Sequence, residues 1–435
     1  MLQLLLIAIR NLAQHTRRTL LLGGAIAGVT ALLVLLMALS TGIRSTMLES
    51  ATTLMTGHLN VAGFYKVTSG QSAPVVTHYQ EVREIIRKEI PDTELAYVTQ
   101  RGRGWAKLIS DTASMQVGIG GIDIAHEPGF KQVVHVLEGN LDDLSQPNTL
   151  LIFEEQAKRL EVKVGDTLTF STSTPRGTSN TIDVRVVAVA KNVGLLSSFN
   201  VFIPDQTLRA LYQLNDDTTG ALLIYLKDMS KVSQVQERLR KAYKAAGYGV
   251  MDASAQPFFQ KFQSVNREDW TGQKLDITTW EDEISFLKWT TAALDVLSFA
   301  LIFVLLVIIA VGIMNTLWIA IRERTREIGT LRAIGMQRFR VMAMFMLEAM
   351  MLAVAATVTG AALALLVCVG LNAANVSVPK AIQLFLMSDR LHLEVTVGWL
   401  LGSILIIVGC TSIVALVPSF LAARLKPVTA MHHIG

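Results

Sequence analysis

Four long stretches of the 435-residue sequence carry no charged residue, and they constrain its fold more than any other feature. They span residues 19–43, 296–321, 349–379 and 395–423, and each exceeds the roughly 20 residues that an α-helix needs to cross a bilayer. A buried helix of a soluble protein could explain one such run, but not four in one chain. The chain is also 51% hydrophobic and only 17% charged, whereas soluble domains are about a quarter charged. The sequence therefore predicts a membrane protein with four transmembrane helices.

The first run has a signal peptide as its alternative reading, with Arg10, Arg17 and Arg18 as the basic region. The run is longer than a signal-peptide core, and no clear small-residue cleavage site follows it. We therefore expect a retained helix. The third run is too long for one crossing, and we expect its helix to end near Asn372.

Lys and Arg gather at one end of these helices. Six arginines lie between the second and third helices, whereas the loop after the third holds only Lys380 and Arg390. Arg424 and Lys426 follow the fourth helix. The positive-inside rule then predicts cytoplasmic termini and a cytoplasmic central loop. The expected segments are a cytoplasmic start (1–18), transmembrane helices (19–43, 291–321, 341–372 and 395–423), an extracytoplasmic domain (44–290), a cytoplasmic loop (322–340), an external loop (373–394) and a cytoplasmic end (424–435).

The large segment between the first two helices has an ordinary α+β pattern. Strand-like residues 57–67 and 95–109 flank a helical stretch at 79–90, and the pattern after Lys131 is all-β. A strand at 220–226 and a helix at 230–246 follow. The whole segment is therefore expected to be a βαβ half, a β-rich insertion and a second βα half. Two flanking segments, residues 41–55 and 280–294, are expected to extend the transmembrane helices, with a simple linker as the alternative.

We find no pattern that predicts catalysis or metal binding. Serines 197 and 198 lack a nucleophile-elbow setting, and Cys368 and Cys410 cannot form a cysteine-pair zinc site or a disulfide framework. No P-loop motif occurs, so the chain has no such ATP site of its own, and a net charge of +4 is too small to imply nucleic acid. The histidines of the segment between the first two helices are scattered without metal-ligand spacing, at positions 58, 78, 126 and 135.

The arginine-rich loop predicts a short amphipathic helix at the membrane surface. Ile328, Leu331 and Ile334 recur every third residue and form a narrow apolar stripe. Gly335 suits the position just past a helix end, where a positive φ is needed. Gly329 costs about 1 kcal/mol relative to alanine inside a helix, which suggests close approach by a partner. A surface helix without a partner is the alternative.

Two polar residues lie within the apolar helices. Asn315 stands seven residues before Arg322, and Glu348 lies near the cytoplasmic end of the third helix. An acid within a membrane is costly and usually faces a protein interior, so we expect Glu348 to do so. An interfacial acid is the alternative.

These motifs resemble the FtsX/MacB/LolC-type ABC transporter permeases. The segment from Arg322 to Gly335 matches E-R-x-x-E-I-G-x-L-R-A-x-G, with Asn315 upstream. Three further parts are similar: the start around Arg10-Asn11, the segment ending in Glu348, and residues 418–427. Residues 148–165 resemble the external subdomain of the MacB and LolC branches.

The resemblance implies a bacterial inner-membrane permease that pairs with a second permease subunit, identical or different, above a cytoplasmic ATPase dimer. That ATPase uses ATP and Mg, and the permease binds no cofactor. Because only ten residues precede Asn11, we expect the ATPase to be a separate polypeptide. Movement of the helices would reshape the external domain by mechanotransmission. The implied coupling residues are Arg322, Glu323, Arg324, Glu327, Gly329, Arg332 and Gly335.

The branches of this family leave several functions open. The segment Gly57-His-Leu-Asn weakly resembles the lipoprotein-releasing LolC/LolE branch, which we prefer, with extraction of lipoproteins from the outer leaflet as its function. MacB-like efflux with a periplasmic adaptor is the alternative. Mechanical regulation of an external hydrolase remains open, and a membrane-anchored external enzyme is disfavoured because no catalytic pattern is present.

Overall fold

The computed structural model describes residues 10–11, 14, 16–68, 70–285, 288–379, 383 and 390–424. The chain divides into two compact units. The first comprises Met1–Arg44, Thr291–Ser377 and Arg390–Gly435, and the second comprises Ser45–Thr290 and Val378–Asp389. Most of the expected N-terminal segment 1–18, much of the external loop 373–394 and the C-terminal residues after Arg424 lie outside the described residues.

The first unit is a bundle of long apolar helices. Among the described residues, four helices are long and apolar enough to cross a membrane, which confirms the predicted fold class. They are α2 (Thr16–Ala51), α11 (Lys288–Glu323), α13 (Arg338–Ala373) and α15 (Val397–Ala423). Small residues let the helices approach closely: a Cβ placed on Gly360 of α13 would lie 2.2 Å from the carbonyl oxygen of Ala27 in α2.

The helix α2 continues past the bilayer-length run into the second unit. It reaches Ala51 and passes directly into a π-helical turn, η1 (Thr52–Thr56). Gly57 then ends the helix with a φ of 61°, and a side chain there would meet Leu223 and Ile224. The predicted helical extension over residues 41–55 is therefore confirmed.

The expected extension before the second transmembrane helix was wrong as a continuous helix. The helix α10 (Trp280–Glu283) stops after one turn, and α11 begins at Lys288. Thr279 and Asp282 cap α10 reciprocally, while the buried Glu283 side chain accepts hydrogen bonds from Asn60 and Thr278. These contacts hold α10 against the sheet.

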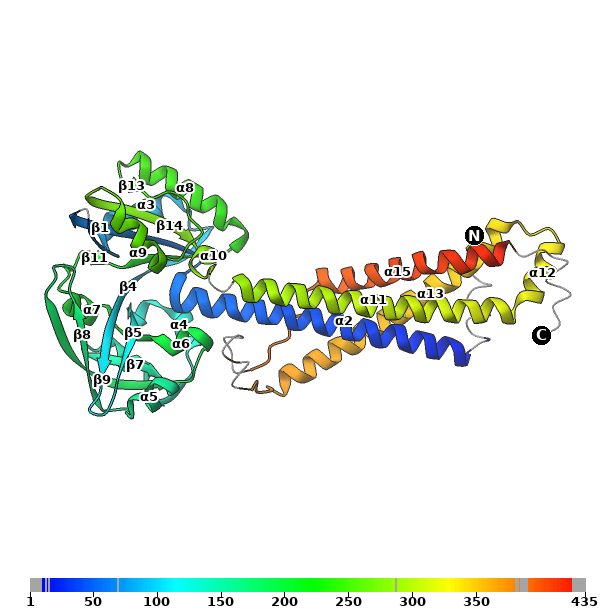
Figure 1. The fold of residues 1–435 in the computed structure, drawn as a ribbon, viewed down its shortest axis with the longest axis horizontal. Helices are drawn as coiled ribbons and strands as arrows, with labels where there is room; N and C mark the ends of the chain where they lie inside the picture. Colours follow the sequence, from blue (N-terminus) through cyan, green and yellow to red (C-terminus); the bar gives the residue numbers. More distant parts are fainter. Residues whose placement is uncertain are drawn as a thin grey trace. The chain divides into compact units, whose positions relative to one another are not determined.

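The second unit contains an extended, mixed β-sheet with helices packed on it (Figure 1). Its main path runs β13-β14-β1-β12-β4-β5-β10-β7-β9-β6. The strands are β1 (Leu59–Thr68), β2 (Gln71–Ala73), β3 (Val76–Thr77), β4 (Leu95–Ile109), β5 (Ser114–Ile122), β6 (Val136–Gly139), β7 (Thr149–Phe153), β8 (Thr167–Ser173), β9 (Ser179–Ala190), β10 (Asn200–Pro204), β11 (Thr218–Thr219), β12 (Ala221–Leu226), β13 (Gly249–Val250) and β14 (Gly272–Thr279).

The long strand β4 joins two halves of this sheet. Its first part pairs with β12 and its second part pairs with β5. Each half has its own apolar core: one lies under α3 and α8 and includes Val82, Leu239 and Ile277, and the other includes Leu150 and Phe170. The remaining helical elements of the unit are α3 (Tyr79–Glu89), η2 (Ile124–His126), α4 (Pro128–Val133), η3 (Leu141–Ser145), α5 (Glu154–Leu160), α6 (Gly194–Phe199), α7 (Asp205–Tyr212), η4 (Met229–Lys231), α8 (Val232–Ala245) and α9 (Phe258–Arg267).

The expectation that the chain becomes all-β after Lys131 was wrong. The helices α5, α6 and α7 alternate with the strands there. Each has only two or three turns at most, so its apolar spacing is too short to show a helical period. In α7, Leu208 and Leu211 are buried three residues apart, which alone does not distinguish a helix from a strand.

Candidate functional site

A cluster of polar side chains around the buried Arg324 joins the end of α11 to α13. Arg324 lies at the start of α12 (Thr325–Ala333). Its guanidinium donates to Glu348 Oε1 at 3.0 Å and to Glu327 Oε2 at 2.8 Å. Asn11 donates to the same Glu348 oxygen. Glu348 is buried, so it faces the protein interior as the sequence predicts, and we call these four residues the Arg324 cluster.

A second set of contacts fixes α12 along its length. Ile328 and Gly329 form its buried face, and Ile328 packs in a cluster with Phe345 and Ala422. Arg332 donates to the carbonyl oxygen of Ala423, the last residue of α15, at 2.9 Å. Thus α12 is attached to two of the long helices at once.

Two expectations about α12 need correction. Ile334 does not belong to the apolar stripe: it follows the last helical residue and is 80% exposed, because the helix ends at Ala333. Gly329 is buried by the chain itself, so its small size serves internal packing and it is not a surface available to a partner. Gly335 has the expected positive φ, 105°.

The opposite face of this region is polar and open. It combines the last residues of α11 with the outward side of α12, and its exposed side chains are Arg322, Glu323, Arg326, Glu327 and Thr330. We call this set the α12 outer face. It carries both signs of charge within two helical turns.

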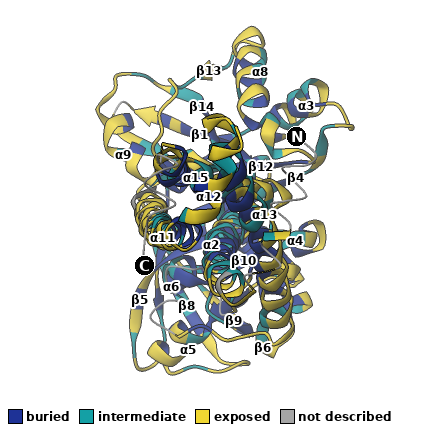
Figure 2. Cartoon of the chain, turned by 90° about the vertical axis from the view of Figure 1, so that its right-hand side faces the viewer, coloured by how far each residue is buried: buried dark blue, intermediate teal, exposed yellow. Residues whose placement is uncertain are grey.

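Asn315 lies apart from the Arg324 cluster. Its side chain is exposed on α11. Of the four long helices, α11 is the least buried: only 11% of the residues in its most apolar stretch are buried. Figure 2 shows α11 largely in the colour of exposed residues. The structure therefore does not bring Asn315 together with Glu348.

A second polar cluster, in the other unit, binds the end of η1. The last carbonyl groups of a helix have no partner within it, and here the sheet supplies donors. Arg101 Nη1 donates to the Leu54 oxygen at 3.0 Å, and the Tyr225 hydroxyl donates to the Thr52 oxygen at 3.0 Å. Both donors lie in the sheet, on β4 and β12. A guanidinium at a helix C-terminus also interacts favourably with the helix dipole.

Arg103 extends this cluster to the other connecting segment. Its Nη2 donates to the Met55 oxygen at 3.4 Å and to Asn60 Oδ1 at 3.2 Å. The Asn60 amide in turn donates to Glu283 of α10 at 3.1 Å. The segments that follow α2 and precede α11 thus share one hydrogen-bonded network, which we call the junction.

The charged side chains of the junction are buried, so each needs a compensating partner nearby. Arg101 and Glu127 form an ion pair in which each side chain is only 2% exposed. Burial lowers the pKa of Arg103, and the nearby Glu283 acts in the opposite direction. Removing one member of such a pair leaves an uncompensated charge in the interior. Among the described residues, no cluster of His, Cys, Asp or Glu has the makings of a metal site.

The sequence analysis did not identify the junction. Arg101 and Arg103 alternate with glycine on β4, and arginine is rarely fully buried, so each would be assigned to a surface. The alternation itself was the available signal, since it places both guanidinium groups on one face of a strand that is otherwise largely apolar.

Together, the apolar helix bundle, the large domain after its first helix and the short attached helix after its second define a membrane permease. Two family models match the sequence: the MacB-like periplasmic core domain over residues 19–242 and the FtsX-like permease C-terminal over residues 299–427. The first alone covers more than half of the chain, and the chain belongs to this family of FtsX/MacB-type ABC transporter permeases. It is thus a membrane protein of a family that points to the bacterial inner membrane.

Several characterised relatives are similar over about a third of the chain. The macrolide export ATP-binding/permease protein MacB 2 of Aeromonas hydrophila is 31% identical over 34% of this chain and 21% of its own length. The MacB of Nitrobacter winogradskyi is 34% identical over 28% and 17%. The pyoverdine export ATP-binding/permease protein PvdT of Pseudomonas entomophila is 32% identical over 33% and 19%. The matches therefore span about a fifth of these relatives.

Two solved structures are similar to part of the chain, but only with low TM-scores. The periplasmic region of MacB from Actinobacillus actinomycetemcomitans has a TM-score of 0.32 at 13% identity, covering 54% of this chain and 94% of that one. The extracellular domain of the transporter YknZ from Gram-positive bacteria has a TM-score of 0.30 at 14% identity, covering 50% and 98%. Neither superposition is close enough to support an argument.

Proposed function

We propose that the chain is the non-catalytic permease subunit of an ABC transporter that works by mechanotransmission with a separate ATPase. The observation that carries this proposal is the junction. Its hydrogen bonds tie η1, which follows α2, to β4, and tie α10, which precedes α11, to Asn60 of β1. Arg103 donates to Asn60 and so links the two strands. A displacement of either helix would therefore reach the sheet through hydrogen bonds rather than through a flexible linker.

The length of α2 supports this proposal. Its 36 residues correspond to about 54 Å at 1.5 Å per residue, whereas the hydrocarbon core of a bilayer is about 30 Å thick. The helix is therefore long enough to extend well beyond the membrane before it meets the junction.

The α12 outer face is the proposed docking surface for the ATPase. Its side chains are exposed, and Arg324 and Arg332 attach the same helix to α13 and α15. A push on α12 would thus be passed to the long helices. In this arrangement the outer face and both chain termini lie in the cytoplasm, as the arginine distribution favours, and ATP and Mg are bound by the partner.

A second permease subunit is the proposed neighbour of α11. A polar side chain facing lipid is unfavourable, and Asn315 is exposed in the single chain. A second copy or a related subunit packed against α11 would cover it.

The proposed cargo is a lipoprotein taken from the outer leaflet, and the supporting feature is the Gly57-His-Leu-Asn segment. The names of the relatives, which export macrolides and pyoverdine, favour efflux as the second candidate. Mechanical regulation of a hydrolase is the third possibility, and it needs no cargo.

One copurification experiment tests the proposal. The chain is purified from its native membranes, and the bound material is identified by mass spectrometry. We expect an ABC ATPase, together with acylated lipoprotein if release is the function, or a periplasmic adaptor if efflux is. Thr330→Trp should reduce the ATPase yield several-fold, whereas Arg340→Trp, outside the outer face, should not. ATPase recovery unchanged by Thr330→Trp would contradict docking at α12, and the absence of any ATPase would contradict the function.

A further inference from the structure

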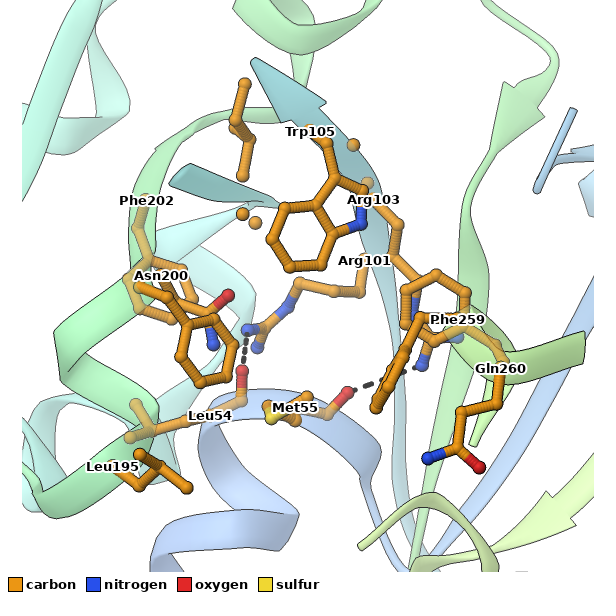
Figure 3. Close-up of a pocket in the computed structure, with 17 residues that line it drawn as sticks. Leu54, Met55, Arg101, Arg103, Trp105, Leu195, Asn200, Phe202, Phe259 and Gln260 are labelled. Atoms are coloured by element: carbon orange, nitrogen blue, oxygen red, sulfur yellow. Dashed lines mark hydrogen bonds between the residues drawn. The ribbon is translucent and has the colours of Figure 1, made fainter. Parts of the chain in front are cut away.

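The second unit contains a cavity of about 430 Å³ beside the junction. Three walls enclose it: the strand β4 with Arg101, Arg103 and Trp105, the helix end with Leu54 and Met55, and aromatic side chains of α6 and α9. Figure 3 shows both guanidinium groups reaching toward the carbonyl groups of the helix end. This volume lies within the usual range for small-molecule sites, about 300–1,000 Å³.

Strand pairing explains why the cavity is open. Arg103 lies opposite Gly120 on β5, and Trp105 lies opposite Gly118. Neither glycine adds a side chain on this face, and neither position could accept one easily: a Cβ on Gly120 would lie 2.7 Å from the Phe202 ring. β5 therefore places no side chain opposite Arg103 or Trp105, and side chains of β10 lie over the two glycines instead.

The cavity is apolar in most of its lining but cationic at one wall. Leu195, Phe199 and Phe259 contribute apolar surface, and none of the described residues that line it carries a carboxylate. The charge of Arg101 is compensated by Glu127. Arg103 instead donates hydrogen bonds to two neutral acceptors, the Met55 and Asn60 oxygens, and the carboxylates of Glu283 and Asp276 act on it through space.

Arg103 also has unused hydrogen-bonding capacity. Its Nη1 has no partner, although it is buried. The Phe258 ring covers the guanidinium at 4.5 Å from Cζ. A buried cationic donor without a partner is costly, and an anion that displaced this ring would satisfy both the charge and the free N–H.

We propose that this cavity binds a small amphiphile that has an apolar body and one anionic group. The carboxylate or phosphate of the ligand pairs with Arg103, and its apolar part lies against Trp105, Phe199 and Phe259. All residues that line the cavity belong to the second unit, so binding can be measured without the ATPase.

Ligand binding at this site is coupled to the helix end. Arg103 donates to the Met55 oxygen, and Leu54 and Met55 form one wall of the cavity. An anion that draws the guanidinium toward itself weakens its bond to the helix end, and by linkage a movement of that end changes ligand affinity equally.

Binding of simple amphiphiles to the full chain tests this proposal. The protein is placed in phosphatidylcholine nanodiscs, and displacement of a fluorescent dansylated undecanoate is measured. Decanoate and decyl phosphate should compete saturably, and comparison of the two identifies the preferred anionic group. Decanol and decyltrimethylammonium should compete at least roughly tenfold more weakly.

Three variants separate charge recognition from general adsorption. Arg103→Met should weaken both anions at least roughly tenfold while leaving decanol unchanged. Lys107→Met removes an exposed cation from the same strand, outside the cavity, and should change nothing. Leu195→Trp fills the cavity and should abolish competition by every ligand, so the test remains valid if Arg103→Met does not fold. Equal competition by decanol and decanoate, binding that survives Leu195→Trp, or the absence of saturable binding would overturn the proposal.

Discussion

At the scale of single residues, the structure uses buried arginines as connectors. Arg101, Arg103 and Arg324 each donate to groups on other elements. Arginine suits this role because its planar guanidinium presents five donors in a fixed geometry and stays charged. The carbonyl groups at the end of η1 need donors in any case, so two of these arginines satisfy a helix end that would otherwise be buried without partners.

Removal of Arg101 should therefore destabilise the junction strongly. Arg101→Met leaves the Glu127 carboxylate buried without its partner, and we expect a loss of about 3–5 kcal/mol. The double variant Arg101→Met, Glu127→Leu should recover most of it, because no isolated charge remains. Amide hydrogen exchange over residues 52–56 in the full chain measures the local opening free energy. Equal losses in the single and double variants would show that the charge is not the cause.

At the scale of elements, tertiary contacts determine the helix boundaries and orientations that the local sequence pattern does not predict. The charge-free runs were enough to predict the four long helices, and Gly335 predicted the end of α12. The break after α10 was not predictable, because Glu283 bonds to Asn60, more than 200 positions away in the chain. The orientation of α12 also depends on distant residues, Glu348 and Ala423, so the sequence could not show that Gly329 lies inward.

The attachment of α12 can be tested at Glu348. Glu348→Leu removes the buried partner of the Arg324 guanidinium and leaves it the exposed Glu327, so we expect α12 to open more easily by about 1.5–3 kcal/mol. Hydrogen exchange of its backbone should accelerate by about one to two orders of magnitude, which is the same effect expressed as a rate. Arg340→Leu, at an exposed position near the start of α13, serves as the control. If exchange in α12 is the same in both variants, the Arg324 cluster does not hold this helix.

At the scale of the whole molecule, the Arg324 cluster lies in one compact unit and the junction lies in the other. The Arg324 cluster fastens the proposed ATPase-facing helix to the bundle, and the junction fastens the helix α2 to the sheet. The intervening helices are apolar and continuous, which suits them to transmit displacement.

Membrane orientation is the simplest prediction at this scale. The test uses a variant that lacks Cys368 and Cys410. In this variant, a cysteine at Thr178, which is exposed in the turn after β8, should react with an impermeant thiol reagent applied from outside. A cysteine at Gln337, beside α12, should react only after permeabilisation. These outcomes follow from the positive-inside rule, and the reverse labelling pattern would exclude the proposed topology.

The central claim is that α2 acts as a rigid connection between ATPase and sheet. It is tested most directly by hydrogen exchange of the copurified complex during ATP turnover. The test variant carries a Gly-Gly-Ser-Gly insertion after Met47. The control carries the same insertion after Arg176, in the exposed turn between β8 and β9. Nucleotide should alter exchange over residues 52–56 and 101–105 in the native chain and in the Arg176 variant. After the Met47 insertion, hydrolysis should continue while this change disappears. An unchanged nucleotide response in the Met47 variant would contradict the account, because a flexible linker would then transmit as well as the helix.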